Sequence, residues 1–183
     1  MPRRALLAAL AAAVLLAAGC SEAGLGDERA QTDTGVVGPG GRTVDATAGE
    51  RAPDFSVPAL RGDGEYVLAY YRGRPVVLNF WASWCEPCKR EMPDLVAFAT
   101  AHPAVAVLGL AVNDKPSDSR RFADRFEVPY DLGIDQKARV AGRYGVTGLP
   151  VTVLLDREGR IVSTRFGAIS RDELESFAER FGA

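Results

Sequence analysis

The sequence holds few of the side chains from which most metal and nucleic-acid sites are built. Three cysteines and a single histidine among 183 residues are too few for a disulfide scaffold and leave little for a four-ligand metal site. Basic residues are not in excess, because 22 Lys and Arg face 24 Asp and Glu. The chain therefore offers no positive field for nucleic acid. It has one long apolar run, which excludes a multi-pass membrane protein.

That apolar run has the order of an export signal. Arg3 and Arg4 precede residues 5–18, which are all Ala, Leu and Val. The run is shorter than the roughly 20 residues that span a bilayer, so we expect residues 1–19 to be a signal peptide. The ending LAAGC at 16–20 resembles a bacterial lipobox, which implies that Cys20 is acylated and anchors the protein to the membrane. Ordinary cleavage after residues 17–19 is the alternative, and both place the protein outside the cytoplasm.

The rest of the chain divides into a tether and one domain. Residues 20–48 are rich in Gly, Thr, Asp and Glu and show neither the period of a strand nor that of a helix. We expect a flexible tether there, with a reach of roughly 25–30 Å. Residues 49–183 have the length of one ordinary domain, which we expect to be globular.

Within the domain, strand and helix patterns alternate, which predicts an α/β fold. A mixed central sheet flanked by helices is expected, with an added N-terminal β-hairpin. Continuous apolar runs predict buried strands, and Ser170 with Glu173 forms a capping box that opens the last helix. The expected strands are 55–60, 65–71, 75–81, 105–112, 151–155 and 161–166, and the expected helices follow Cys88 and cover 117–126, 136–144 and the residues after Ser170.

Two cysteines separated by two residues follow the expected strand 75–81. This position puts Cys85 just before a helix and Cys88 in its first turn, with only Cys85 facing out. Unpaired N–H groups and the helix dipole lower the pKa of a thiol placed there, so Cys85 is predicted to be the nucleophile and Cys88 the resolving thiol. Pro87 suits a helix N-terminus, while Glu86 opposes the thiolate that the basic residues after Cys88 favour.

Two structural alternatives for this cysteine pair are weaker. Half of a zinc site would need two further ligands, and only His102 and Cys20 remain. A purely structural disulfide across so short a loop would stabilise little. We therefore predict a pair that cycles between dithiol and disulfide, with no metal and no other cofactor.

Residues 77–93, VLNFWASWCEPCKREMP, resemble the TlpA/ResA-like branch of the thioredoxin-fold thiol-disulfide oxidoreductases. The resemblance covers about residues 49–183, including the N-terminal hairpin, the segment 52–55 and the Gly-Leu-Pro at 148–150. It implies a thioredoxin-like fold. It also implies that Pro150 is cis and that the backbone of Leu149 pairs with substrate next to the cysteines.

Further site residues follow from the same resemblance. Asn79 stands where thioredoxin has a buried Asp, so that general base is missing. Glu91 matches an acidic residue that influences the cysteine pKa values in ResA-like proteins, although a solvated Glu on the helix surface is the competing view. Trp84 is expected to cover Cys85 and to offer an apolar surface to a client, and Trp81 is expected in the core.

The resemblance also implies a function. Such proteins commonly reduce disulfides of exported proteins, often the haem-attachment cysteines of apocytochrome c, with electrons from a membrane thiol transporter. We therefore expect a lipid-anchored reductase of the bacterial cell envelope that takes part in cytochrome c maturation and binds no nucleic acid. An oxidase or isomerase of exported thiols would use the same residues.

Two further relatives of this fold fit less well. A peroxiredoxin-type peroxidase would carry Thr and Pro where this chain has Ala82 and Leu78. A copper chaperone would need three residues between its cysteines and a distant metal-binding His, whereas His102 is expected at a helix end. Asn113 and Asp114 follow a buried strand at the sheet edge where ligands gather, yet turn capping explains them equally well.

Overall fold

The computed structural model describes residues 48–181. The expected signal peptide, Cys20 and all of the expected tether except its last residue lie outside the described residues. Within the described part, no helix combines the length and the apolar character needed to cross a membrane.

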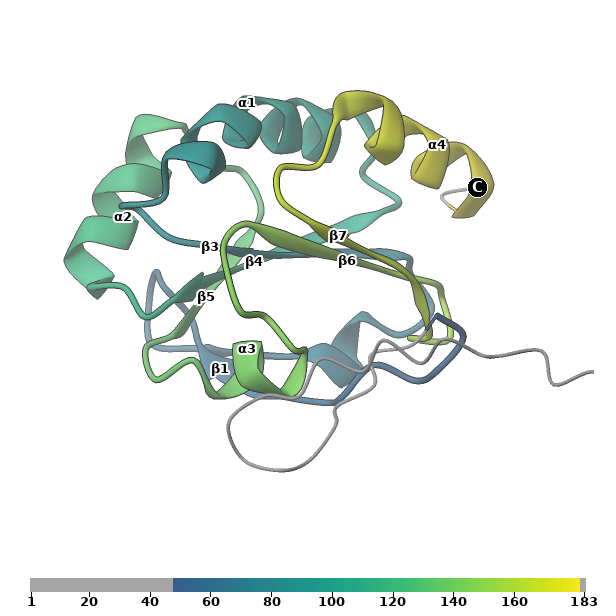
Figure 1. Ribbon diagram of the computed structural model, residues 1–183, viewed down its shortest axis with the longest axis horizontal. Coiled ribbons are helices and arrows are strands. Elements are labelled where there is room, and N and C mark those ends of the chain that lie inside the picture. The colour runs from purple at the N-terminus through teal and green to yellow at the C-terminus, as the bar shows by residue number, and fades with distance from the viewer. Residues whose placement is uncertain (1–47, 182–183) are drawn as a thin grey trace, which may run out of the picture. The chain divides into compact units, whose positions relative to one another are not determined.

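A five-stranded mixed sheet forms the centre of the domain, with the strand order β5-β4-β3-β6-β7 (Figure 1). The neighbours β3, β4 and β5 are parallel, and β6 and β7 continue the sheet antiparallel. The strands are β3 (Val76–Trp81), β4 (Ala106–Val112), β5 (Asp131–Asp135), β6 (Val151–Leu155) and β7 (Ile161–Phe166).

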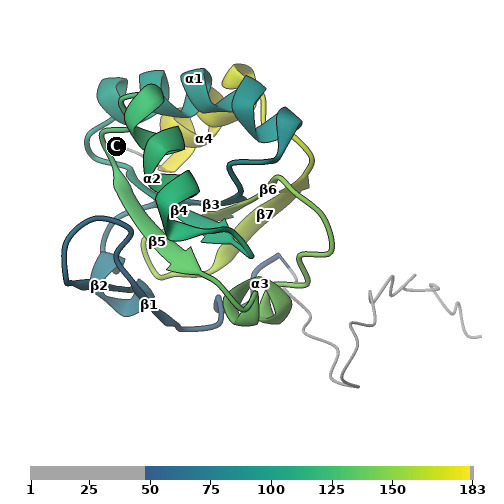
Figure 2. The ribbon, with the colours of Figure 1, turned by 90° about the vertical axis from the view of Figure 1, so that its left-hand side faces the viewer.

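Helices cover one face of this sheet, and a smaller layer covers the other. In both ribbon views α1 (Glu86–Ala101), α2 (Pro116–Arg125) and α4 (Arg171–Phe181) lie on one side. On the other side lie the hairpin of β1 (Ser56–Pro58) and β2 (Glu65–Val67), the 3-10 turn η1 (Leu68–Tyr71) and α3 (Arg139–Arg143) (Figure 2). Every residue of β3 and β4 is buried, as expected of strands that are covered on both faces.

The apolar core follows this layering. On the hairpin side, Phe55 and Tyr144 pack against the even-numbered residues of β3, such as Phe80. On the helix side, the core near the end of β3 contains Trp81 and both cysteines. The residues that follow β3, including both cysteines, therefore pack on the helix side of the sheet.

The N-terminal hairpin is fixed to the edge of the sheet. Ala59 forms an isolated bridge with Gly133 of β5, and the Leu60 N–H donates to the Leu132 carbonyl at 2.6 Å. A Cβ at Gly133 would lie 2.5 Å from Val57 Cγ2, so a larger residue there would force the hairpin or the Val57 side chain to shift. The added hairpin is thus an integral layer of the domain.

The fold confirms the predicted α/β class with its mixed sheet and N-terminal hairpin, but several elements differ. The sequence reading missed β5, because its acidic ends and central glycine give it little apolar pattern. Residues 65–71 are a strand only to Val67 and continue as η1, and the third helix is limited to α3. The capping box of α4 is present, since Glu173 Oε2 accepts from Ser170 N–H at 3.0 Å and the Glu173 N–H donates to Ser170 Oγ at 3.3 Å.

Candidate redox site

The cysteine pair lies where β3 leads into α1, at the carboxyl edge of the parallel strands. Cys85 is the N-cap of α1, and Cys88 lies in the first turn of this helix. The turn that precedes the helix closes when the Cys85 N–H donates to the Ala82 carbonyl at 3.2 Å. Local sequence explains the helix start, because Pro87 tolerates a position without a hydrogen-bonded N–H.

Cys85 and Cys88 form a disulfide, with their Cα atoms 5.3 Å apart. The exposed fraction is 4% for Cys85 and 0% for Cys88. Cys85 is therefore more exposed than Cys88, as expected, but the difference in exposed fraction is small. An attacking thiolate can reach the Cys85 sulfur more readily than the fully buried Cys88 sulfur.

The helix start supplies Cys85 with a hydrogen-bond donor. The Cys88 N–H points at Cys85 Sγ, at 3.2 Å from nitrogen to sulfur. After reduction, this N–H and the positive end of the helix dipole would stabilise a Cys85 thiolate. In this hydrogen bond Cys88 contributes only its backbone N–H, whereas Cys85 contributes its sulfur. The helix start would therefore stabilise a thiolate on Cys85 and not one on Cys88.

Charged side chains at the helix start largely neutralise one another. Lys89 forms an ion pair with Glu86, which lowers the pKa of the Glu86 carboxyl, and Glu86 is fully exposed. Arg90 is exposed, so water screens its charge. The first turn of α1 therefore adds little net positive charge to the helix dipole.

The peptide bond between Leu149 and Pro150 is cis, as the resemblance implies. Pro150 is buried, while Leu149 is half-buried and packs against the apolar cluster that contains both cysteines. Trp84 is 59% exposed and is thus an apolar surface beside Cys85, whereas Trp81 is fully buried in the core as expected. The structure thus brings Leu149 and Trp81 into one apolar cluster with both cysteines.

Glu91 is buried, which overturns the view of a solvated residue on the helix surface. Only 2% of it is exposed, and it lies one turn after Cys88 on the same face of α1. Its Oε1 accepts from Asn79 Nδ2 at 2.9 Å, and its Oε2 accepts from the Ile169 N–H at 3.0 Å. Asn79 Nδ2 also donates to Thr152 Oγ1 at 3.0 Å, while Asn79 Oδ1 has no partner among the described residues.

Burial raises the pKa of Glu91 from 4.5 to about 7, because desolvation outweighs the hydrogen bonds from Asn79 and Ile169. The side chain can therefore exchange a proton near neutral pH within one helical turn of Cys88. Tyr130 also faces this region, where burial and the charge of Glu91 both raise its pKa. Its hydroxyl donates to the Met92 sulfur at 3.0 Å.

Sequence reasoning missed two partners in this network, Thr152 and the backbone N–H of Ile169. Thr152 carried a weak signal, because it is the one polar residue in the apolar strand 151–155. No local pattern points to Ile169, which lies 78 residues from Glu91 in the chain.

Other candidate features lie away from the cysteines. His102 ends α1, and its Nε2 lies 2.8 Å from Glu175 Oε2, which fits the expected helix-end residue. Within residues 48–181 no group of three or more potential ligands could hold a metal ion.

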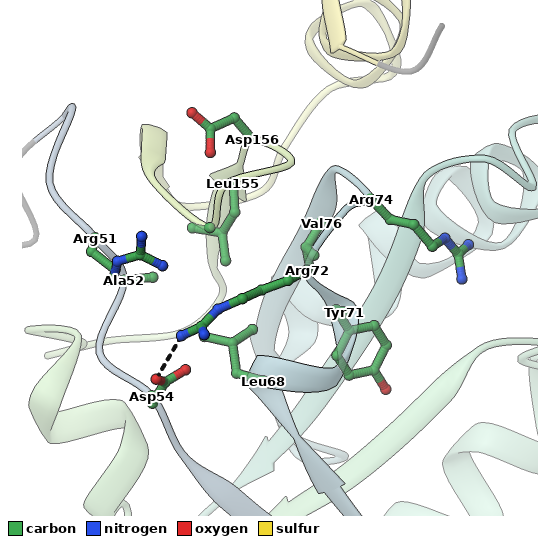
Figure 3. A pocket seen from close by; sticks show the side chains of 11 residues that line it. Arg51, Ala52, Asp54, Leu68, Tyr71, Arg72, Arg74, Val76, Leu155 and Asp156 are labelled. Carbon is green, nitrogen blue, oxygen red and sulfur yellow. Dashed lines mark hydrogen bonds and ion pairs between the residues drawn. The ribbon is translucent and has the colours of Figure 1, made fainter.

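A hollow lined by Arg51, Asp54 and Arg72 lies beside Val76 at the opposite end of β3 (Figure 3). Its volume of about 10 Å³ suffices for a single water molecule.

The chain is similar to proteins of the thioredoxin-fold group in sequence and in structure. The sequence model of the AhpC/TSA family matches residues 48–164. The thiol-disulfide oxidoreductase ResA of Geobacillus thermodenitrificans is 35% identical over 133 residues, which are 72% of this chain and 76% of that protein.

Two solved structures are similar across nearly their whole length. A putative thiol:disulfide interchange protein DsbE from Chlorobium tepidum has a TM-score of 0.68 at 28% identity, over 73% of this chain and 96% of that one. A secreted Mycobacterium tuberculosis disulfide oxidoreductase, described as homologous to Escherichia coli DsbE, has a TM-score of 0.64 at 27% identity, over 69% and 96%.

Proposed function

The chain belongs to the AhpC/TSA family and, within it, to the ResA-like thiol-disulfide oxidoreductases, and on this premise we propose that it reduces disulfides of exported proteins at Cys85 and Cys88. The observation that carries the proposal is the disulfide at the start of α1, with the Cys88 N–H directed at Cys85 Sγ. Apocytochrome c, with its paired haem-attachment cysteines, is the client we propose, which would make cytochrome c maturation the process served.

The reaction begins with the reduced protein. The Cys85 thiolate attacks one sulfur of the client disulfide, a bond forms between the two sulfurs, and the second client sulfur leaves as a thiolate that takes up a proton. Cys88 then loses its proton and attacks Cys85 Sγ, which forms the intramolecular disulfide and releases the first client sulfur. Two electrons pass to the client, and a thiol donor at the membrane must restore the dithiol.

The charges around the pair favour this direction. A strong oxidant of this type owes its potential to a reduced form with a highly stabilised thiolate. Here Glu86 pairs with Lys89, and the buried Glu91 brings negative charge close to Cys88 once it is ionised. Both effects destabilise a thiolate relative to a site with free cations, so the dithiol gives up its electrons more readily.

The remaining residues of the site would hold the client. The backbone of Leu149, which precedes the cis Pro150, would pair with an extended segment of the client, and the exposed Trp84 would add an apolar contact. An export signal in residues 1–19 and a lipid on Cys20 would keep the domain on the outer side of the membrane, near such a donor. The secreted relative of Mycobacterium tuberculosis supports an extracytoplasmic location.

The midpoint potential of the pair tests the direction of electron flow. Purified protein would be equilibrated with glutathione and dithiothreitol buffers, and the fraction of Cys85–Cys88 disulfide would be measured by thiol alkylation. A potential near or below roughly −230 mV supports a reductase. A potential near roughly −120 mV would instead make the protein an oxidase of exported thiols, and the absence of a reversible two-electron couple would refute exchange at this pair.

Membership of the AhpC/TSA family does not by itself make the chain a peroxidase. The positions three and seven residues before Cys85 hold Ala82 and Leu78, both fully buried and apolar. The Ala82 side chain lacks the hydroxyl with which Thr at this position could donate a hydrogen bond to a bound peroxide. Peroxide consumption by the reduced protein would therefore be slow compared with reduction of a protein disulfide.

A further inference from the structure

Asp114 collects four hydrogen bonds beside the redox site. It follows β4, is only 7% exposed, and its Oδ2 accepts from the Ser83 N–H at 2.7 Å while its Oδ1 accepts from Ser83 Oγ at 3.0 Å. Two more donors come from the start of α2. The Lys115 N–H donates to Oδ1 at 2.8 Å, and Ser119 Oγ donates to Oδ2 at 2.7 Å.

Turn capping accounts for the two bonds on the α2 side but not for the two from Ser83. Ser83 belongs to the turn between Ala82 and Cys85, which carries the exposed Trp84 and ends in the N-cap thiol. Both polar groups that Ser83 offers as donors are bound to one carboxylate that lies 31 residues away in the chain. The turn is therefore attached to the end of β4 as well as to β3 and α1.

We propose that Asp114 is a positioning residue for Cys85, which holds the Ser83–Trp84 turn so that the thiol meets a protein disulfide in the reactive orientation. Attack on a disulfide requires the thiolate to approach along the axis of the bond that breaks, so a small rotation of the turn removes many productive encounters. Asp114 acts through Ser83 and touches neither the substrate nor the reacting sulfurs.

The test isolates the first chemical step. In the full chain carrying Cys88→Ser, the Cys85 thiol attacks a disulfide and the mixed disulfide accumulates because no resolving thiol follows. Insulin serves as a protein disulfide and oxidised glutathione as a small one. Mass spectrometry with peptide mapping measures the adduct on Cys85 apart from any on Cys20.

In this background, Asp114→Asn should lower the rate constant for insulin about tenfold. The amide nitrogen replaces an oxygen that accepts one hydrogen bond from Ser83 and one from the α2 side, and losing the charge-assisted bond from Ser83 corresponds to roughly that factor. The rate constant for oxidised glutathione should change less than threefold, because a small disulfide can approach Cys85 from more directions. Ser83→Ala should lower the insulin rate in the same sense. The double variant should lose less than the product of the two single factors, because both changes act on the contact between Ser83 and Asp114.

Ser119→Ala is the matched control. It removes a hydrogen bond to the same carboxylate from the α2 side, so it tests whether general loosening around Asp114 is sufficient. The proposal requires an insulin rate within twofold of the parent for Ser119→Ala at a temperature where all variants are folded by circular dichroism.

Equal loss of rate in Ser119→Ala and Ser83→Ala would overturn the proposal, and so would an unchanged insulin rate in folded Asp114→Asn. Equal loss toward insulin and glutathione in Asp114→Asn would do the same, because it would indicate a changed thiol instead of a changed orientation. The proposal rests on thiol-disulfide exchange at Cys85 and not on its direction. Failure of the Cys88→Ser parent to form any adduct would refute the exchange chemistry and is thus distinct from failure of the positioning role.

Discussion

Replacing the buried Glu91 by glutamine should remove a large part of the pH dependence of stability. The carboxyl is 2% exposed, and its pKa rises from 4.5 to about 7 in the folded protein. Between these two values the native state keeps a proton that the unfolded chain has released. The free energy of unfolding therefore falls as the pH rises through this window, because deprotonation favours the unfolded state.

The magnitude follows from the two pKa values. One pH unit of difference is worth about 1.4 kcal/mol, so the rise to about 7 corresponds to a loss of about 3 kcal/mol between pH 4.5 and pH 7 or slightly above. The loss is absent below pH 4.5, where both states are protonated, and constant well above pH 7. In Glu91→Gln this contribution disappears at every pH.

Urea unfolding of the oxidised protein at pH 5 to 8.5 measures the effect. Glu91→Gln also brings an amide NH₂ group near the donors Asn79 Nδ2 and Ile169 N–H, which costs stability equally at all pH values. The informative quantity is therefore the pH dependence of the difference between the variant and the parent, in which all other titrating groups cancel. Between pH 5 and pH 8.5 this difference should shift by about 2.5 kcal/mol in favour of the variant.

Glu86→Gln is the matched control on the same helix. Glu86 is fully exposed and has a lowered pKa through Lys89, so this variant should keep the downward trend of the parent across the window. A difference between Glu91→Gln and the parent that stays flat within about 0.5 kcal/mol from pH 5 to pH 8.5 would contradict a carboxyl that titrates near neutrality.

Three further changes test other parts of the structure. Cys88→Ser should trap a mixed disulfide between Cys85 and a client, whereas Cys85→Ser should trap none; non-reducing gels and mass spectrometry separate the two, and equal trapping would refute the assignment of the nucleophile. Gly133→Ala should destabilise the domain by about 1–3 kcal/mol in urea unfolding, because its Cβ would lie 2.5 Å from Val57 Cγ2. Adding Val57→Ala should recover part of this loss, and a Gly133→Ala domain as stable as the parent would mean that the hairpin can shift freely. Ser170→Ala should cost about 1 kcal/mol of unfolding free energy and Ser170→Thr much less, since only the latter keeps a hydroxyl that accepts from the Glu173 N–H and donates to the Glu173 carboxylate; equal losses would contradict the capping role.

Features that depend on neighbouring residues in the chain could be predicted from the amino-acid sequence alone. Apolar runs predicted β3 and β4, and the residues of the helix start placed Cys85 at the N-cap and Cys88 in the first turn. The capping box at Ser170 and Glu173 was equally local. Such signals can be read directly because backbone geometry and caps are decided within a few residues.

Features that join distant segments of the chain depend on how the elements pack and could not be predicted in this way. The segment Asp131–Asp135 forms the strand β5 because it pairs with β4. Its acidic and glycine-containing sequence does not indicate this partner. Glu91 is buried because Asn79 on β3 and Ile169 before α4, 12 and 78 residues away, meet its two oxygens. Asp114 binds Ser83 across 31 residues for the same reason. A carboxylate on a helix or in a turn has the same local pattern whether it is solvated or buried, and only the packing of other elements around it distinguishes the two.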